Sequence, residues 1–152
     1  MTFPAIHASN LEHRAFRLPS DFEGERNLLL IAFERDQQEN VETWLPEVQR
    51  LLRAYPNLRF YELPTIRRGN PLFRSWLDNA MRAGIHDRTA REQTITLYVD
   101  KKEFRQALDL PHEQNIYALL VDRSGRVLWR ADGLATPEKI QDLERVLKTK
   151  NT

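Results

Sequence analysis

The chain has 152 residues, of which 41 % are hydrophobic and 30 % charged, and its formal net charge is +1 at pH 7. This length and apolar content predict one folded domain over residues 1–152, with an extended N-terminal arm over residues 1–27. The near-neutral charge excludes the strongly basic profile of a nucleic-acid-binding domain. The longest apolar run, from Leu28 to Phe33, is much shorter than the ~20 residues of a transmembrane helix.

The sequence contains no cysteine, which excludes disulfides, thiolate metal sites, thiol nucleophiles and dithiol redox chemistry. The four histidines lack the spacing of metal ligands, and no phosphate-binding loop, dinucleotide fingerprint or serine-nucleophile motif is found. We therefore expect no metal, no cofactor and no catalytic residue. The first residues, Met1 to His7, show neither a signal peptide nor a transit peptide, which predicts a cytoplasmic location.

The first half of the chain predicts two strands, each followed by a helix. Leu28 to Phe33 is a short apolar run without alternation, typical of a strand buried on both faces. After a polar break over residues 34–40, apolar residues recur at helical spacing from Val41 to Leu52. Pro46 lies inside this helix, so the helix is either kinked there or begins at Trp44 after a Thr43 cap.

The second strand spans residues 58–63 and is closed by Pro64. Asn70-Pro71 then provides a cap and a first-turn proline for a helix over residues 71–83. A third strand over residues 95–99 and a short helix over residues 102–108 follow.

The last part of the chain predicts a hairpin and a final helix. Strands over 117–121 and 127–130 flank the turn from Asp122 to Gly125, with glycine at the left-handed position. Thr136 and Pro137 provide the cap and first turn of the last helix. The element order predicts an α/β fold whose central mixed five-stranded sheet is flanked by helices on both faces. The expected order of its strands is 95–99, 58–63, 28–34, 117–121 and 127–130.

This order, with a strand-to-helix junction after Ala32-Phe33 and a late hairpin over residues 121–128, resembles the thioredoxin superfamily. The extra strand–helix unit over residues 95–109 is similar to that of its peroxiredoxin-like branch. The resemblance implies that the position of the reactive cysteines corresponds to residues 35–38, where this chain has no sulfur atom. It also implies a cis-proline just before the late hairpin, where this chain has Asn115-Ile116. Since a thiolate is the nucleophile in that chemistry, the superfamily's redox activity is not expected here.

Within the superfamily, the chain resembles the assembly-factor family of the mitochondrial F-type ATP synthase, which helps a membrane-embedded subunit to join the complex. The resemblance rests on scattered blocks of sequence: Phe73 to Trp76, Met81 to Ile85, Thr94 to Asp100, Ile116 to Asp122, Trp129, Gly133, and Ala135-Thr136. It implies a protein partner, which could be a subunit of a membrane complex.

Two surfaces are candidates for binding that partner. The first is the loop over residues 34–40, after the strand that ends at Phe33, with Arg35, Asp36, Gln37 and Gln38 as a polar recognition site. The alternative for this loop is that its polar residues only cap a helix. The second surface is a basic segment between residues 67 and 91, suited to an acidic or anionic partner. Its candidate binding residues are Arg67, Arg68, Arg74, Arg82 and Arg88.

The alternative for the basic segment is an ordinary solvated helix face with ion pairs. We expect a redox-inactive interaction or assembly module rather than an enzyme. The alternative function is a small-ligand-binding enzyme, such as a thiol-independent transferase or hydrolase, that uses the same strand-end cleft.

Overall fold

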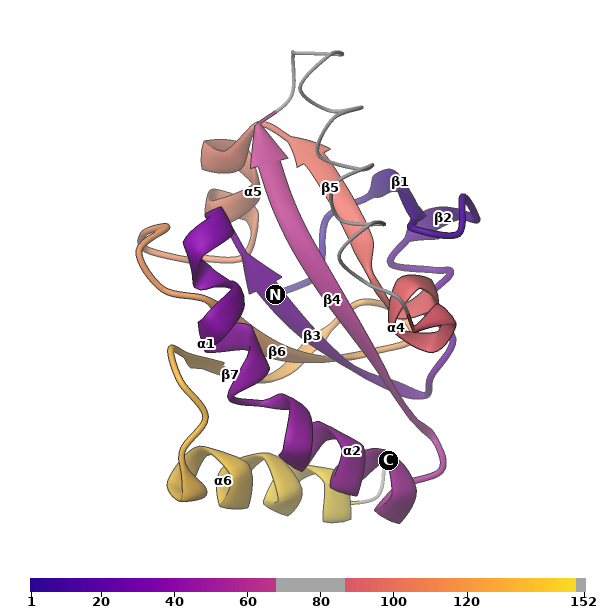
Figure 1. Ribbon diagram of the computed structural model, residues 1–152, viewed down its shortest axis with the longest axis vertical. Coiled ribbons are helices and arrows are strands. Elements are labelled where there is room, and N and C mark those ends of the chain that lie inside the picture. The colour runs from indigo at the N-terminus through magenta and orange to yellow at the C-terminus, as the bar shows by residue number, and fades with distance from the viewer. Residues whose placement is uncertain (68–86, 150–152) are drawn as a thin grey trace.

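The computed structural model describes residues 1–67 and 87–149 of the protein (Figure 1). The described strands are β1 (Ile6–Asn10), β2 (Ala15–Leu18), β3 (Arg26–Ala32), β4 (Leu58–Arg67), β5 (Ile95–Val99), β6 (Tyr117–Asp122) and β7 (Val127–Asp132). The described helices are η1 (Arg35–Gln37, a 3-10 turn), α1 (Gln38–Glu42), α2 (Leu45–Ala54), α4 (Arg88–Gln93), α5 (Lys101–Ala107) and α6 (Pro137–Lys148). None of the described helices is long and apolar enough to span a membrane.

The strands form one mixed sheet in the order β2-β1-β5-β4-β3-β6-β7. β3, β4 and β5 are parallel neighbours, and the remaining pairs are antiparallel. The predicted order of the five central strands is confirmed. The predicted number of strands is wrong, because β1 and β2 extend the sheet beyond β5.

These two extra strands lie in the segment that the sequence predicts as an extended arm. They are short, and β1 pairs with β5 through Ser9 opposite Thr96 and Asn10 opposite Ile95. Sequence periodicity could not predict this pairing, because the partner strand lies more than eighty residues further along the chain.

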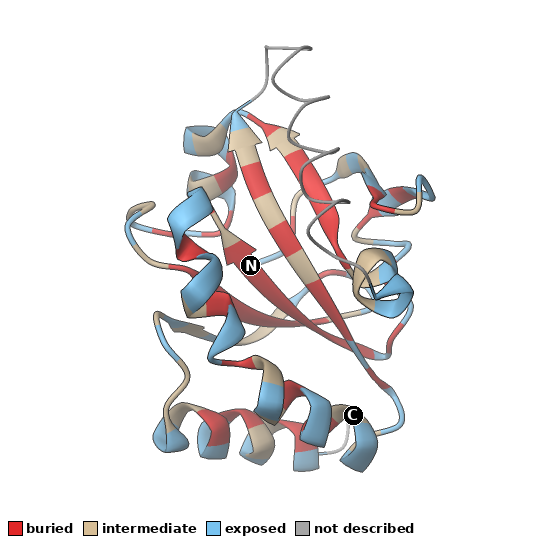
Figure 2. Cartoon of the chain, viewed as in Figure 1, coloured by how far each residue is buried: buried red, intermediate tan, exposed pale blue. Residues whose placement is uncertain are grey.

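The apolar run of β3 is buried on both faces, as predicted. Leu28 and Leu30 face one core, and Leu29 and Ile31 face the other, because successive side chains of a strand point to opposite sides. Figure 2 shows β3 buried along almost its whole length, whereas buried and half-buried residues alternate along much of β4.

Different elements pack against the two faces of the sheet. On the first face α2 and α6 lie side by side, joined by an ion pair between Arg50 and Glu144 at 2.5 Å (Figure 1). On the second face, the aromatic side chains of Phe3, Phe22 and Phe104 make edge-on contacts. Phe104 belongs to α5, so this helix helps to close the second core.

The helix predicted around Pro46 is interrupted rather than kinked. α1 ends at Glu42 and α2 begins at Leu45, with Pro46 in the first turn of α2. A continuous helix is disfavoured because the proline ring would clash with the carbonyl group of Glu42. The predicted Thr43 cap is wrong: the hydroxyl group of Thr43 donates to the carbonyl oxygen of Asn40 at 2.7 Å instead.

The predicted hairpin and the start of the last helix are confirmed. Gly125 has a φ of +85°, and a side chain there would also meet Pro19, whose Cγ would be 2.5 Å from a Cβ. The hydroxyl oxygen of Thr136 accepts a hydrogen bond from the N–H of Lys139 at 3.3 Å, which caps α6.

The predicted helix over residues 71–83 lies outside the described residues. The short helix α4 that follows was not predicted. Its N-cap is Asp87, which accepts a hydrogen bond from the N–H of Thr89 at 3.1 Å.

Candidate functional site

The strand-end loop, residues 34–38, lies at the carboxyl end of β3, where the chain leaves the sheet. Its middle residues form the 3-10 turn η1, and α1 starts at Gln38. Carboxyl ends of central strands are the usual ligand-binding end of open α/β sheets. The structure therefore places the loop where the sequence predicts a recognition site.

Gln37 differs from the expected role of a recognition residue, because it is only 5 % exposed. Its Oε1 accepts hydrogen bonds from the N–H groups of Phe33, at 2.8 Å, and Glu34, at 3.1 Å. Its Nε2 donates to the carbonyl oxygen of Glu113 at 2.7 Å. The side-chain amide is therefore used inside the protein, where it holds the loop. The spacing of Glu34 and Gln37, that of a capping box, is the sequence signal for this role.

Two basic residues of α5 hold the end of β3 and the segment before β6, and the sequence analysis missed both. Lys101 Nζ donates to the carbonyl oxygen of Phe33 at 2.9 Å and lies 3.5 Å from a carboxylate oxygen of Glu113. Arg105 Nε donates to the other carboxylate oxygen of Glu113 at 3.0 Å. The loop and the segment before β6 are thus connected through both side chains and main chain.

The outer side of the loop is polar and exposed. Arg35, Asp36 and Gln38 are all exposed, and their role in recognition stays a prediction. Glu39 and Glu42 on α1 are exposed as well, so carboxylates outnumber the single arginine on this part of the surface. Such a surface favours polar and charged contacts over an apolar interface.

Glu62 on β4 is a polar group that the sequence analysis missed. It is half-buried, and its carboxylate accepts a hydrogen bond from Nε2 of Gln38 at 3.4 Å. Burial raises the pKa of the Glu62 carboxyl, hydrogen bonds from Gln38 and Thr94 oppose the increase, and the nearby Glu42 adds to it. Raised pKa values occur at functional carboxyls as well as structural ones. Nothing in the strand pattern of residues 58–63 distinguishes this glutamate from an exposed one.

The resemblance assigns the position of the superfamily's reactive thiols to residues 35–38, which contain no sulfur atom. Among the described residues, the cis peptide bond lies between Leu18 and Pro19, in the turn after β2, and not before β6. Asn115 and Ile116 therefore enter β6 without the superfamily's cis-proline, as the sequence predicts.

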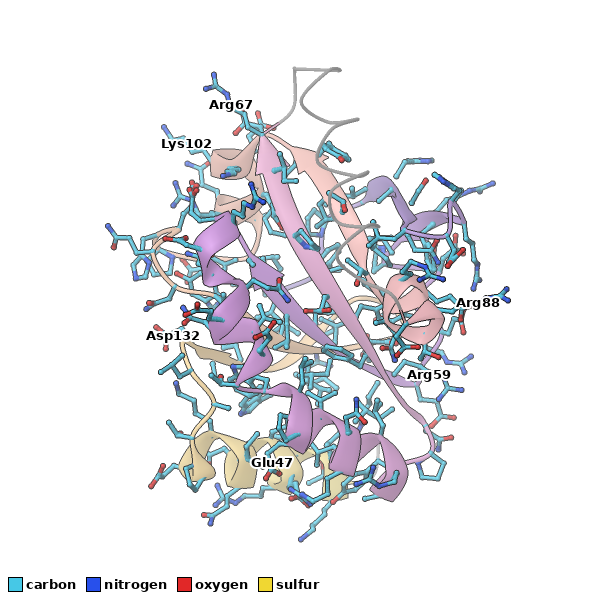
Figure 3. The ribbon with its side chains drawn as sticks, viewed as in Figure 1. Glu47, Arg59, Arg67, Arg88, Lys102 and Asp132 are labelled. Carbon is cyan, nitrogen blue, oxygen red and sulfur yellow. The ribbon has the colours of Figure 1, made fainter. Side chains whose placement is uncertain are left out.

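The basic segment is described only at its two ends. Arg67 is exposed at the carboxyl end of β4, the same end of the sheet as the strand-end loop. Arg88 is exposed on α4, which precedes β5 and lies at the opposite end (Figure 3). Its guanidinium pairs with Glu92 at 3.0 Å in an ordinary surface ion pair. The remaining predicted residues, Arg68, Arg74 and Arg82, lie outside the described residues.

The model of the family described as "ATP10 protein" matches residues 1–149. The chain belongs to the ATP10 protein family. This confirms the resemblance to the ATP synthase assembly factors that the scattered sequence blocks indicate. No curated protein matches this ATP10-family chain.

Solved structures share the fold of this ATP10-family chain. A putative electron transfer protein from Aquifex aeolicus aligns with a TM-score of 0.64 and 11 % identity, over 97 % of this chain and 94 % of the other. A thiol:disulfide interchange protein from Bacteroides sp. aligns with a TM-score of 0.63 and 17 % identity, over 97 % and 89 %. The thioredoxin domain of a Bacteroides vulgatus thiol-disulfide oxidoreductase has a TM-score of 0.60 and 19 % identity, over 97 % and 96 %. At these identities the likeness establishes a thioredoxin-like fold and no shared activity.

Proposed function

We propose that this ATP10-family protein is a redox-inactive thioredoxin-like module that binds a protein partner and acts as an assembly factor for an F-type ATP synthase. The observation that carries the proposal is the strand-end loop. It keeps the position of the superfamily's active site, has no sulfur atom, and is held in a defined shape by Gln37.

Redox inactivity follows from the chemistry of the loop. Disulfide exchange needs a thiolate, and neither the amide of Gln38 nor the carboxylate of Asp36 can form a mixed disulfide. We expect the purified protein to give no turnover in an insulin-reduction assay. Turnover above the buffer blank would contradict this part of the proposal.

Binding of a protein partner is supported by the same surface. The partner in the proposal is a subunit of the enzyme's membrane sector, in keeping with the family's role in assembly. The charged side chains of Arg35 and Asp36 would contact its extramembrane part through charge-assisted hydrogen bonds. No metal, cofactor, nucleic acid or catalytic residue takes part in the proposed function, and the cytoplasmic location stays a prediction.

The deciding experiment combines capture with a gene deletion. The tagged protein is incubated with detergent-solubilised membranes of its host, and the bound ATP synthase subunits are identified. In parallel, assembled ATP synthase is quantified in the deletion strain. We expect enrichment of a membrane-sector subunit and a loss of assembled enzyme. Normal assembly after deletion, together with no enriched subunit, would overturn the proposal.

Charge reversal identifies the binding surface. The double variant Arg35→Glu with Asp36→Lys should lose capture, because both side chains are exposed on the loop. The control is Arg123→Glu, an exposed arginine in the turn between β6 and β7, at the opposite end of the sheet. The basic segment is tested by Arg74→Glu with Arg82→Glu, which the sequence predicts to abolish capture with no change in melting temperature.

A second candidate function rests on Glu62. A half-buried carboxyl with a raised pKa beside Gln38 could act as a general acid or base for a small substrate at this end of the sheet. This supports the alternative of a thiol-independent transferase or hydrolase. A melting-temperature screen against phosphates, thiols and short peptides separates the two functions. A ligand whose stabilising effect disappears in Glu62→Gln would favour the enzyme.

A further inference from the structure

The side-chain amide of Gln37 connects two segments that are distant in sequence. One is the strand-end loop, and the other is the pre-β6 segment, residues 112–115. We infer that the contact surface of the proposed function consists of both segments, and that Gln37 is the positioning residue that holds them together. This inference rests on the proposed function and adds the pre-β6 segment to its surface.

The first support is the hydrogen bonding of the main chain at the end of β3. The N–H groups of Phe33 and Glu34 both bond to Gln37 Oε1, at 2.8 and 3.1 Å. Phe33 is buried, so its N–H has no access to water if that acceptor is lost. An unpaired buried N–H group is costly, and the loop would move to satisfy it. Gln37 is therefore needed for the position of the loop.

The second support is the hydrogen bond that Gln37 donates to the pre-β6 segment. Gln37 Nε2 donates to the main-chain carbonyl of Glu113 at 2.7 Å, within the pre-β6 segment. This bond joins residues that are 76 positions apart, and it acts on the main chain, so it sets where the whole segment lies.

The third support comes from α5, which fixes Glu113 from its other side. Lys101 bonds to the carbonyl oxygen of Phe33 at 2.9 Å and lies 3.5 Å from the Glu113 carboxylate. Arg105 bonds to the same carboxylate at 3.0 Å and to the carbonyl oxygen of Pro111 at 3.2 Å. Lys101 Nζ also lies 3.7 Å from a carboxylate oxygen of Glu34, so it contacts both segments, and a shift of either segment would break a contact with Lys101.

Exposed side chains project from this connected main chain. Arg35 and Asp36 come from the strand-end loop, and Gln114 comes from the pre-β6 segment. A surface held in its bound shape loses less conformational entropy on binding, which raises affinity. We therefore expect Gln114 to contact the partner, although no sequence motif indicated this residue.

Amide hydrogen exchange tests the connection between the segments. In Gln37→Met, which keeps the length of the side chain but removes all three bonds, exchange at residues 33–34 and 112–115 should be about tenfold faster. Gln37→Glu retains the acceptor but loses the donor at neutral pH. It should therefore accelerate residues 112–115 and leave residues 33–34 protected. The matched control is Gln141→Met on the exposed face of α6.

Capture of the host's detergent-solubilised ATP synthase membrane sector tests the functional part. Gln37→Met should lower capture about tenfold, and Gln114→Lys, an exposed change, should lower it with no change in melting temperature. Unchanged exchange at residues 112–115 in Gln37→Met would overturn the connection. Full capture by Gln114→Lys, or by Gln37→Met, would overturn the composite surface. Absence of capture by the wild-type protein would instead contradict the proposed function.

Discussion

The guanidinium group of Arg26, at the start of β3, donates through Nη1 to the carbonyl oxygen of Val146 at 2.6 Å. Its Nη2 donates to the carbonyl oxygen of Thr149, so one arginine reaches two carbonyl groups at the end of α6. Carbonyl groups in the last turn of a helix have no partner within the helix. The central strand of the sheet thereby caps the helix that covers it.

Replacing Arg26 should therefore destabilise the protein. We expect Arg26→Met to lower the free energy of unfolding by about 2–3 kcal/mol, because two hydrogen bonds from a charged donor are lost. The carbonyl oxygen of Val146 keeps a hydrogen bond from the hydroxyl group of Thr149 at 2.6 Å, so the loss comes from the charged donor rather than from an unpaired carbonyl. Urea unfolding measures the change. Arg53→Met, an exposed position in the last turn of α2, is the control and should change stability by less than about 0.5 kcal/mol. Equal effects of the two changes would contradict the capping role.

The hydrogen bond of the Trp44 indole should contribute to the stability of the folded protein. Its Nε1 donates to the carbonyl oxygen of Gly133 at 3.0 Å, and the residue is fully buried. Trp44→Phe should cost about 1–3 kcal/mol, because it leaves that carbonyl unpaired and removes ring volume from the core. Thermal unfolding checks this. Trp129→Phe is the comparison, because Trp129 makes an edge-on contact with Trp44 but is partly exposed. We expect a smaller loss of stability for Trp129→Phe than for Trp44→Phe.

Glu62 should make stability depend on pH. Burial raises the pKa of its carboxyl above the ordinary value of 4.5, so the folded state binds this proton more tightly than the unfolded state. The ionised form is therefore unfavourable in the folded protein, and its cost appears as pH rises from 4.5 through the raised pKa. Glu62→Gln should be more stable than the wild type at pH 7, and the difference should disappear as pH falls below 4.5. Urea titrations at several pH values measure the difference in stability between Glu62→Gln and the wild type. A difference that is constant at all pH values would refute the prediction.

The strand-end loop should not activate a thiol even when one is introduced. In Gln38→Cys, the new sulfur would lie on the side chain that now reaches Glu62, and one helical turn from Glu42. The negative charges of both carboxylates disfavour a thiolate. We expect a thiol pKa at or above the ordinary ~8.5, measured from the pH dependence of alkylation.

The control for this thiol is Gln141→Cys on the exposed face of α6. Combining Gln38→Cys with Glu62→Gln should lower the thiol pKa relative to Gln38→Cys alone. A strongly reactive thiol in Gln38→Cys at pH 7 would show that the loop retains the electrostatics of a redox site.

Local patterns predicted the elements that depend on local physics. The turn before β7 was predicted because Gly125 adopts a positive φ that other residues avoid. The start of α6 was predicted from Thr136 and Pro137, which satisfy and pre-form its first turn. The order of the five central strands followed from the handedness of the connections between parallel strands.

Other features could not be predicted from local patterns. β1 pairs with β5, β2 pairs with β1, and β2 buries Phe16 and Leu18, all of which depends on the assembled sheet. The break between α1 and α2 was one of several outcomes that Pro46 permits, and the hydrogen bond from Trp44 to Gly133 lies at that break.

The sequence by itself determined that no thiol chemistry is available, because that depends only on which atoms the chain contains. Only the tertiary structure decided which polar residues of the strand-end loop are exposed and which face the interior. Gln37 and Gln38 are adjacent and chemically identical, yet one is buried and the other exposed. The difference arises because Gln37 meets the main chain of Glu113, 76 positions away, and contacts over that separation leave no periodic trace in the sequence.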